Sequence, residues 1–280
     1  MVKIITDSAS DIDFQLAKES GVHIIPVEII FEDKTYLSGE ISNAQFYEML
    51  ENCKVLPKTS KITDVKFCEI FKPYANTGDD VLYFSMGAKL SGTYESALRA
   101  KEILNAKNIH VIDTDNITFG QGAIILETLR LIRQNMPLDK IFEKIEFFKK
   151  SVSVIAVIGD LKYLKLGGRL SGVAAIVGTL IKVKPVIRIK DGLVINVHKA
   201  IGMKKACEYI IEQAVNDRDE NYPVYYAHAN SPEKLNNFLE TLNGRLPLPE
   251  KNGVFELGNT VGLHVGPDSI GLLYFKKINE

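Results

Sequence analysis

Short runs of apolar residues alternate with amphipathic stretches along the first half of the chain. The runs Val2–Ile5, Val81–Phe84 and Ile109–Ile112 each have the length of a buried strand, and each ends at polar residues. Between these runs, apolar residues at helical spacing predict helices, the first of which begins near Phe14 and is closed by Gly21. Strands that alternate with helices predict an α/β fold with a largely parallel sheet.

Other signals mark where further elements begin or break. Ser42–Gln45 has the sequence of a capping box, and Thr63 can cap the helix that follows it, so a helix is predicted after each. His23–Phe31 is interpreted as a second strand, with Pro26 at an edge or a bulge. Thr118–Asn135 is predicted to be a long helix, and a further helix reaches residue 150.

The pattern changes beyond residue 150. Ser153–Ile158 is predicted to be a strand, and Val183–Lys190 and Leu193–Val197 flank Asp191 and Gly192, which indicate a hairpin with a type I′ turn. Helices are predicted at 204–215 and 232–242, and strands at 223–227 and 270–275. We therefore expect two α/β domains: residues 1–150 with a mostly parallel sheet, and residues 151–280 with a mixed or antiparallel sheet.

Composition narrows the class of ligand. The 280 residues include 34 Lys and Arg against 35 Asp and Glu, and this balance favours neither nucleic acid nor an anionic membrane as a partner. Three separated cysteines, at 53, 68 and 207, have no metal-ligand spacing and are expected to be reduced. Because the sequence shows neither a signal peptide nor an apolar span of membrane length, we expect a cytoplasmic protein with a small ligand.

The turn at Ser91, Gly92 and Thr93 lies where a predicted strand leads into a helix. The first amides of a helix lack intrahelical acceptors and the helix dipole is positive there, so an anion can bind, with two hydroxyls as further donors. The alternative is that these residues only cap the helix. Thr6–Ser8 and Asp113–Thr114 also follow strands, and we expect the three turns to converge on one crevice.

Three features of the second half are open to two interpretations. Arg169, which follows the glycine pair at 167–168, could bind a carboxylate or lie on a solvated surface turn. Val173–Ile181 is almost wholly apolar and could be a core helix or the wall of a long cavity. His264 lies among glycines and apolar residues, where a histidine is more often part of the core than of a site.

Several catalytic motifs are missing from the sequence. It contains no GxxxxGK[ST] or GxGxxG loop for nucleotides, no GxSxG elbow and no HExxH zinc motif. No metal, nucleotide or other cofactor is therefore expected, and no set of residues indicates catalysis by this chain alone.

Seven segments together resemble the DegV family over the full length. They are ITDSASD at 5–11, KTS at 58–60, LSGTYESA at 90–97, VIDT at 111–114, LKLGGRLSG at 164–172, KP at 184–185 and HVGP at 264–267. The resemblance implies a bacterial two-domain α/β protein that binds a long-chain fatty acid between its domains. It further implies a non-catalytic carrier, which presents the fatty acid carboxylate to a separate ATP-dependent fatty acid kinase for phospholipid synthesis.

The resemblance also implies which residues bind the carboxylate. These are Thr59, Ser91 and His264, with Arg169 nearby and the backbone of Gly92 and Thr93. The chain departs from the family pattern in three places: Lys61-Ile62-Thr63 replaces the usual Gln-Pro-Ser, Met86-Gly87-Ala88 lacks a second small polar position, and Asp268 replaces a glycine. The added lysine near Thr59 leaves the identity of the head group open.

The leading hypothesis is a fatty acid carrier, in which hydroxyls and an imidazole bind the carboxylate and burial of the tail supplies the affinity. One alternative is an acyl hydrolase of lipid esters that uses Ser91 and His264, and another is a sensor of a different small amphiphile. We expect a monomer whose partners are a long-chain fatty acid and a kinase subunit, without nucleic acid and with at most transient membrane contact.

Overall fold

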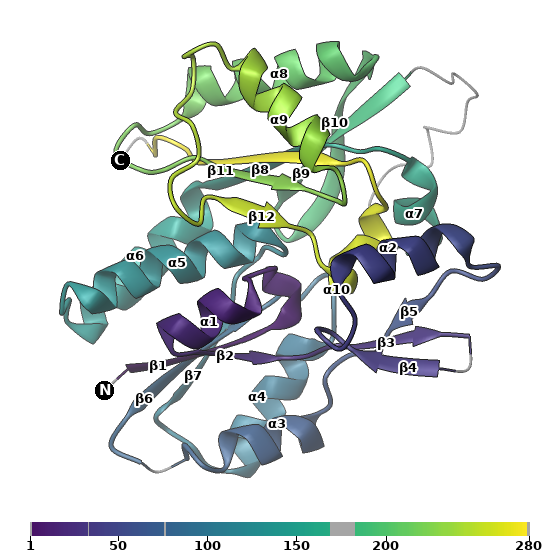
Figure 1. Cartoon of the computed structure of the whole chain (residues 1–280). Coiled ribbons are helices and arrows are strands. Elements are labelled where there is room, and N and C mark those ends of the chain that lie inside the picture. Colours follow the sequence, from purple (N-terminus) through teal and green to yellow (C-terminus); the bar gives the residue numbers. More distant parts are fainter. Residues whose placement is uncertain (1, 33, 76, 169–182, 279–280) are drawn as a thin grey trace.

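The first half of the chain forms a parallel four-stranded sheet. The computed structural model describes residues 2–32, 34–75, 77–168 and 183–278. The strands β1 (Val2–Asp7), β2 (Val22–Ile25), β6 (Asp80–Ser85) and β7 (Ile109–Asp113) lie in the order β2-β1-β6-β7, and every neighbouring pair is parallel. The parallel sheet expected from the alternating pattern is confirmed (Figure 1).

Helices cover both faces of this sheet and begin at the predicted caps. Figure 1 shows α1 (Phe14–Ser20) on one face and α3 (Asp64–Phe71) and α4 (Thr93–Ile103) on the other. Gly21 closes α1 with φ +72°, Thr63 accepts a hydrogen bond from an amide of α3, and Ser42 completes a capping box at α2 (Asn43–Asn52). These local signals were sufficient to predict where the helices begin and end, because capping depends on a few neighbouring residues.

The prediction of one strand over His23–Phe31 is wrong. The segment divides into β2 and β3 (Glu28–Phe31), and β3 belongs to a separate antiparallel sheet with the order β4-β3-β5. Pro26 explains the division, because it has no N–H to continue a ladder of hydrogen bonds. The partners β4 (Lys34–Leu37) and β5 (Lys58–Thr59) are short strands that the pattern did not predict.

The second half forms a mixed six-stranded sheet with the order β10-β9-β8-β13-β11-β12. Its strands are β8 (Val152–Val157), β9 (Val183–Lys190), β10 (Leu193–Ile201), β11 (Tyr225–His228), β12 (Val254–Glu256) and β13 (Ile270–Phe275). Among these described strands only the pair β11–β12 is parallel. Asp191 and Gly192 have φ of +51° and +70°, as a type I′ hairpin turn requires, so the predicted hairpin is confirmed.

The helices of the second half flank this sheet. Figure 1 shows α8 (Met203–Asp217) and α9 (Pro232–Thr241) on its outer face, and α5 (Phe119–Arg133) and α6 (Leu138–Ser151) on the side that faces the parallel sheet. Two short helices, α7 (Leu161–Leu166) and α10 (Asn259–Val265), and the 3-10 turn η1 (Ser8–Ser10) complete the described elements.

Helix α5 joins the two halves. It contacts β8 and β11 of the mixed sheet as well as β6 and η1, and one continuous cluster of buried apolar side chains includes residues of both sheets. A second cluster lies between the mixed sheet and α8 and α9. The predicted domain boundary at residue 150 falls where α6 gives way to β8 and stays a prediction.

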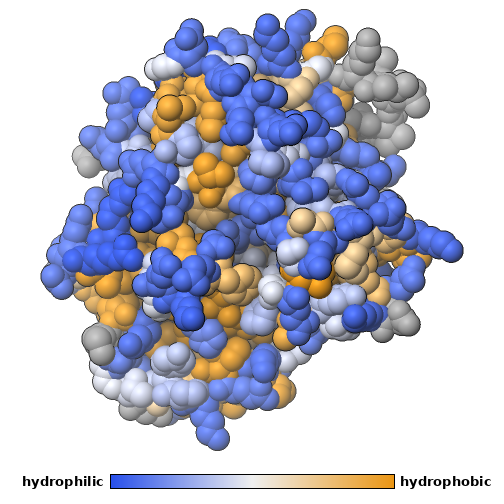
Figure 2. Space-filling view, viewed as in Figure 1, coloured by the Kyte–Doolittle hydropathy of each residue, from blue (hydrophilic) through white to orange (hydrophobic). Residues whose placement is uncertain are grey.

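The face of the molecule in Figure 2 is largely polar. Figure 2 shows charged and polar residues over most of one face, with apolar residues in smaller patches among them. Among the described helices none is long and apolar enough to span a membrane. The cysteines at 53, 68 and 207 are all free thiols.

Candidate functional site

A cavity of about 330 Å³ lies between the mixed sheet and the N-terminal half of the chain. Its volume is within the range of about 300–1,000 Å³ that is usual for small-molecule sites. The described residues that line it come from β5, the loop and N-cap before α4, the helices α5, α7 and α10, four strands of the mixed sheet and adjacent loops: Val27, Thr59, Ser60, Lys61, Met86, Leu90, Ser91, Gly92, Ile117, Thr118, Phe119, Val154, Ala156, Ile158, Leu164, Ile187, Ile189, Val194, Leu257, Thr260, Val261, His264, Val265, Ser269, Ile270 and Gly271.

Most of the wall is apolar, and its shape follows from the pleat of the mixed sheet. Alternate residues of a strand face the same side, which brings Ala156 of β8 and Ile187 of β9 to the cavity. Ala156 pairs with Ile187 on one side and with Gly271 of β13 on the other. Ala156 presents only a methyl group to the cavity, whereas the ring of Phe119 packs on Gly271, because a methyl group there would lie 2.5 Å from Phe119 Cζ.

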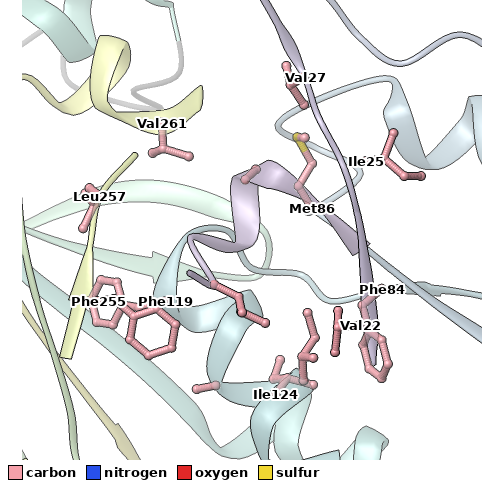
Figure 3. Packing of buried hydrophobic residues seen from close by; sticks show 14 of the residues in the cluster. Val22, Ile25, Val27, Phe84, Met86, Phe119, Ile124, Phe255, Leu257 and Val261 are labelled. Atoms are coloured by element: carbon pink, nitrogen blue, oxygen red, sulfur yellow. The ribbon is translucent and has the colours of Figure 1, made fainter. Parts of the chain in front are cut away.

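The opposite wall comes from segments far apart in the sequence. Figure 3 shows Val27 and Met86 from the N-terminal half, and Leu257 and Val261 from the C-terminal half, around the same region. All four side chains are buried. The apolar part of the cavity therefore suits a hydrocarbon chain, which gains roughly 0.8 kcal/mol for each methylene removed from water.

Polar residues gather at the part of the cavity where β5 and α4 meet. Thr59 ends β5 and pairs with Ile29 of β3, while Ser91 and Gly92 precede the first turn of α4. The Ser91 hydroxyl lies 2.9 Å from the Thr93 hydroxyl and accepts the Thr93 amide hydrogen at 3.3 Å. Both described hydrogen bonds of Ser91 are with Thr93, so the hydroxyl is held at the helix start.

The beginning of α4 retains donors for an anion. Gly92 is the N-cap residue and makes no side-chain cap, and the described residues offer no acceptor to the amides of Tyr94 and Glu95. The partial positive charge of these amides adds to the helix dipole. The helix start can therefore stabilise a negatively charged group at the polar part of the cavity.

His264 reaches the cavity from α10. Contacts across the two halves hold this helix in place: the Tyr47 hydroxyl donates to the Leu257 carbonyl at 2.9 Å, and the Ser8 and Thr260 hydroxyls lie 2.8 Å apart. Gly167, after α7, packs closely on the imidazole, because a methyl group there would lie 2.4 Å from His264 Nδ1. The absence of a side chain at Gly167 thus leaves room for the ring.

The expected convergence of three polar turns on the cavity is wrong for two of them. Asp7 is fully buried and accepts hydrogen bonds from the amides of Ala9 and Met86, both at 3.1 Å, and from the Tyr83 hydroxyl at 3.0 Å. The Asp113 carboxylate accepts the Ala88 amide at 3.1 Å. Neither carboxylate is among the residues that line the cavity; both fix the loop that leads from β6 to α4.

Burial raises the pKa of Asp7 above its ordinary value, although the hydrogen bonds from Met86, Tyr83, Gln121 and Ala9 act in the opposite direction. The desolvation of a carboxylate is costly, and several donors compensate it only in part. Asp7 therefore has a structural role: it anchors the loop between β6 and α4, here called the site loop.

Four of the predicted site residues line one cavity: Thr59, Ser91, Gly92 and His264. Thr93 is fully buried behind Ser91 and supports it through the hydroxyl contact. Arg169, and the candidate wall 173–181, lie outside the described residues. The strands that do form the apolar wall were predicted as strands, yet their role in a cavity was missed.

Among the described residues, no group of three or more His, Cys, Asp or Glu side chains could hold a metal ion. The polar groups at the cavity are hydroxyls, an imidazole, backbone amides and the ammonium of Lys61. These groups donate hydrogen bonds to an anion.

Fold and cavity together define an α/β protein with two principal sheets and a mainly apolar ligand cavity between its halves, polar at one part. A sequence model described as "Uncharacterised protein, DegV family" matches residues 1–277. The chain belongs to the DegV family.

Relatives and solved structures are similar to this chain over nearly its whole length. A DegV domain-containing protein of Caldanaerobacter subterraneus subsp. tengcongensis is 31% identical over 99% of both chains. The crystal structure of a stearic acid-binding protein from Eubacterium ventriosum is similar with a TM-score of 0.89, 27% identity and 99% coverage of both chains. The crystal structure of DegV, a fatty acid binding protein from Bacillus subtilis, has a TM-score of 0.84 with 25% identity, again over 99% of both chains.

Proposed function

We propose that this protein binds a long-chain fatty acid in the cavity between its halves. The tail lies along the apolar wall of the mixed sheet, and the carboxylate binds to Thr59, Ser91, Gly92 and His264, with Thr93 in support. Arg169, outside the described residues, is a further proposed contact. The observation that carries the proposal is a largely apolar cavity with donors gathered at one part, in a fold shared with solved fatty-acid-binding proteins.

The proposed role is that of a carrier and not of a catalyst. A groove of about 550 Å³ outside the cavity shares Thr59 and His264 with it and is further lined by Gly167 and residues 54–58. A carboxylate bound at this part therefore lies beside an open surface, where a separate ATP-dependent kinase can reach it. We propose such a kinase subunit as the partner of a monomeric, cytoplasmic carrier.

The first test is native mass spectrometry of the purified protein, before and after removal of lipid and incubation with palmitate. We expect one fatty acid per chain, released on denaturation. Ser91→Ala should weaken palmitate binding about tenfold, because a hydrogen bond to a charged group contributes roughly 1.5 kcal/mol or more. Ser42→Ala is the matched control, since that serine caps α2 and does not line the cavity.

A delipidated protein that takes up no palmitate would contradict the proposal. Addition of a bacterial fatty acid kinase with ATP to the palmitate complex tests the carrier role separately: acyl phosphate is expected only when both proteins are present.

A further inference from the structure

Lys61 follows Thr59 and Ser60 on the loop that leaves β5, at the polar part of the cavity. Its side chain is exposed and lines the cavity. The chain of methylenes passes directly over Gly92: a methyl group built on Gly92 would lie 3.3 Å from Lys61 Cδ and 3.9 Å from Nζ. Apart from the chain neighbours of Gly92, no other atom of the described residues lies within 4 Å of that position, so the Lys61 side chain covers the N-cap of α4.

In the described part of the chain no carboxylate lies within ion-pair distance of the Lys61 ammonium, although Glu28 and Glu69 line a neighbouring groove with it. None of the ion pairs in the described part of the chain includes Lys61, whereas its neighbour Lys66 pairs with Glu69 at 3.0 Å. Glu95 lies in the first turn of α4 but makes no ion pair with it. An ammonium beside the positive end of a helix is repelled unless an anion lies between the two.

We propose that Lys61 determines the head-group specificity of the cavity, by selecting an ionised anionic head group over a neutral one on the same hydrocarbon chain. This inference rests on the proposed fatty acid function. The hydroxyls of Thr59 and Ser91 bind a carboxylate or an alcohol alike, because a hydroxyl both donates and accepts hydrogen bonds. A fixed positive charge makes the distinction, since its attraction requires a negative charge on the ligand.

The experiment compares the affinities for palmitate and hexadecanol, which share a chain and differ in charge. Dissociation constants are measured at low salt and in 0.5 M NaCl (~3–5 Å Debye length) for the wild type, Lys61→Gln, Lys61→Arg and Lys66→Gln. Lys61→Gln should weaken palmitate binding about fivefold at low salt, the upper range for a partly exposed ion pair, and leave hexadecanol binding unchanged. High salt should reduce this difference, because it screens the charge.

The two other variants separate charge from packing. Lys61→Arg keeps the charge and should retain the preference for palmitate. Lys66→Gln removes a second exposed lysine, one that does not line this cavity, and should bind both ligands as the wild type does. Circular dichroism before each titration verifies that the variants are folded.

The outcomes distinguish the inference from the function on which it rests. A Lys61→Gln protein that loses affinity for both ligands equally, or for neither, overturns the role of Lys61 while fatty acid binding stands. A wild-type protein that binds neither ligand overturns the proposed function and this inference with it. Loss of palmitate affinity alone, restored in Lys61→Arg, supports the inference.

Discussion

Replacement of Asp7 by alanine tests how the fold holds the site loop. The change removes the acceptor of two buried backbone amides, those of Ala9 and Met86, each at 3.1 Å, and of the Tyr83 hydroxyl at 3.0 Å. A buried donor without an acceptor costs roughly 1–3 kcal/mol, and removal of a desolvated carboxylate offsets part of the total. We expect the free energy of unfolding to fall by about 3 kcal/mol.

The assay is equilibrium unfolding in urea, followed by circular dichroism. Asp13→Ala is the matched control: its carboxylate accepts one exposed amide, that of Leu16 at 2.9 Å, and caps α1, so its loss should cost about 1 kcal/mol. Because Met86 lines the cavity, Asp7→Ala should also weaken palmitate binding. A loss of stability no larger than that of Asp13→Ala would refute the anchoring role of Asp7.

The pH dependence of unfolding gives a second measure of the same residue. Burial raises the folded-state pKa of Asp7 above that of the unfolded chain, so the native state binds the proton more tightly. The part of the stability that comes from this tighter proton binding is therefore complete below the unfolded pKa, about 3.9, and is lost as the pH rises through the raised folded pKa. In Asp7→Ala this fall in the free energy of unfolding with pH should be smaller than in the wild type; an identical slope would contradict the raised pKa.

Three further changes follow from close contacts and burial. Gly167→Ala would place a methyl group 2.4 Å from His264 Nδ1, at a backbone φ of −71° that alanine tolerates. Palmitate affinity should therefore fall about tenfold in a titration, while the thermal unfolding curve stays the same. Unchanged affinity would exclude His264 from the head-group contacts. Gly262→Ala would place a methyl group 2.6 Å from the hydroxyl of the fully buried Tyr47. We expect thermal unfolding to show a destabilisation of about 1–3 kcal/mol. A variant as stable as the wild type would show that α10 can shift at little cost. Burial raises the pKa of Cys207 to about 11, so about one thiol in a thousand is ionised at pH 8. Iodoacetamide should therefore leave Cys207 unmodified until the protein is unfolded, as measured by mass spectrometry of the labelled peptides. Rapid labelling of the folded protein would disprove the burial.

Local elements were predictable where the signal lies within a few residues. The capping box at Ser42, the cap at Thr63 and the hairpin turn at Asp191 all form as predicted. In each case one or two hydrogen bonds or a permitted φ decide the conformation, and the surrounding fold has no part in it. The alternation of strands and helices was equally informative about the parallel sheet.

Predictions failed where a partner distant in the sequence decides the outcome. The apolar run His23–Phe31 has the composition of one strand, but its second part pairs with β4 and β5 and leaves the parallel sheet. The polar residues Asp7 and Asp113 follow strands as ligand-binding residues do, yet their carboxylates are used by backbone amides of neighbouring loops. Composition does not show which of the available donors a buried acceptor meets.

The sequence by itself determined the two α/β halves, the positions of Thr59, Ser91 and His264 as candidates, and the family resemblance that links them. Only the tertiary structure decided that these residues share one cavity, that four strands of the mixed sheet line its wall, and that Lys61 lies over Gly92. The physical reason is that caps and strands depend on neighbouring residues, whereas a cavity exists only where side chains of separate elements fail to fill the space between them.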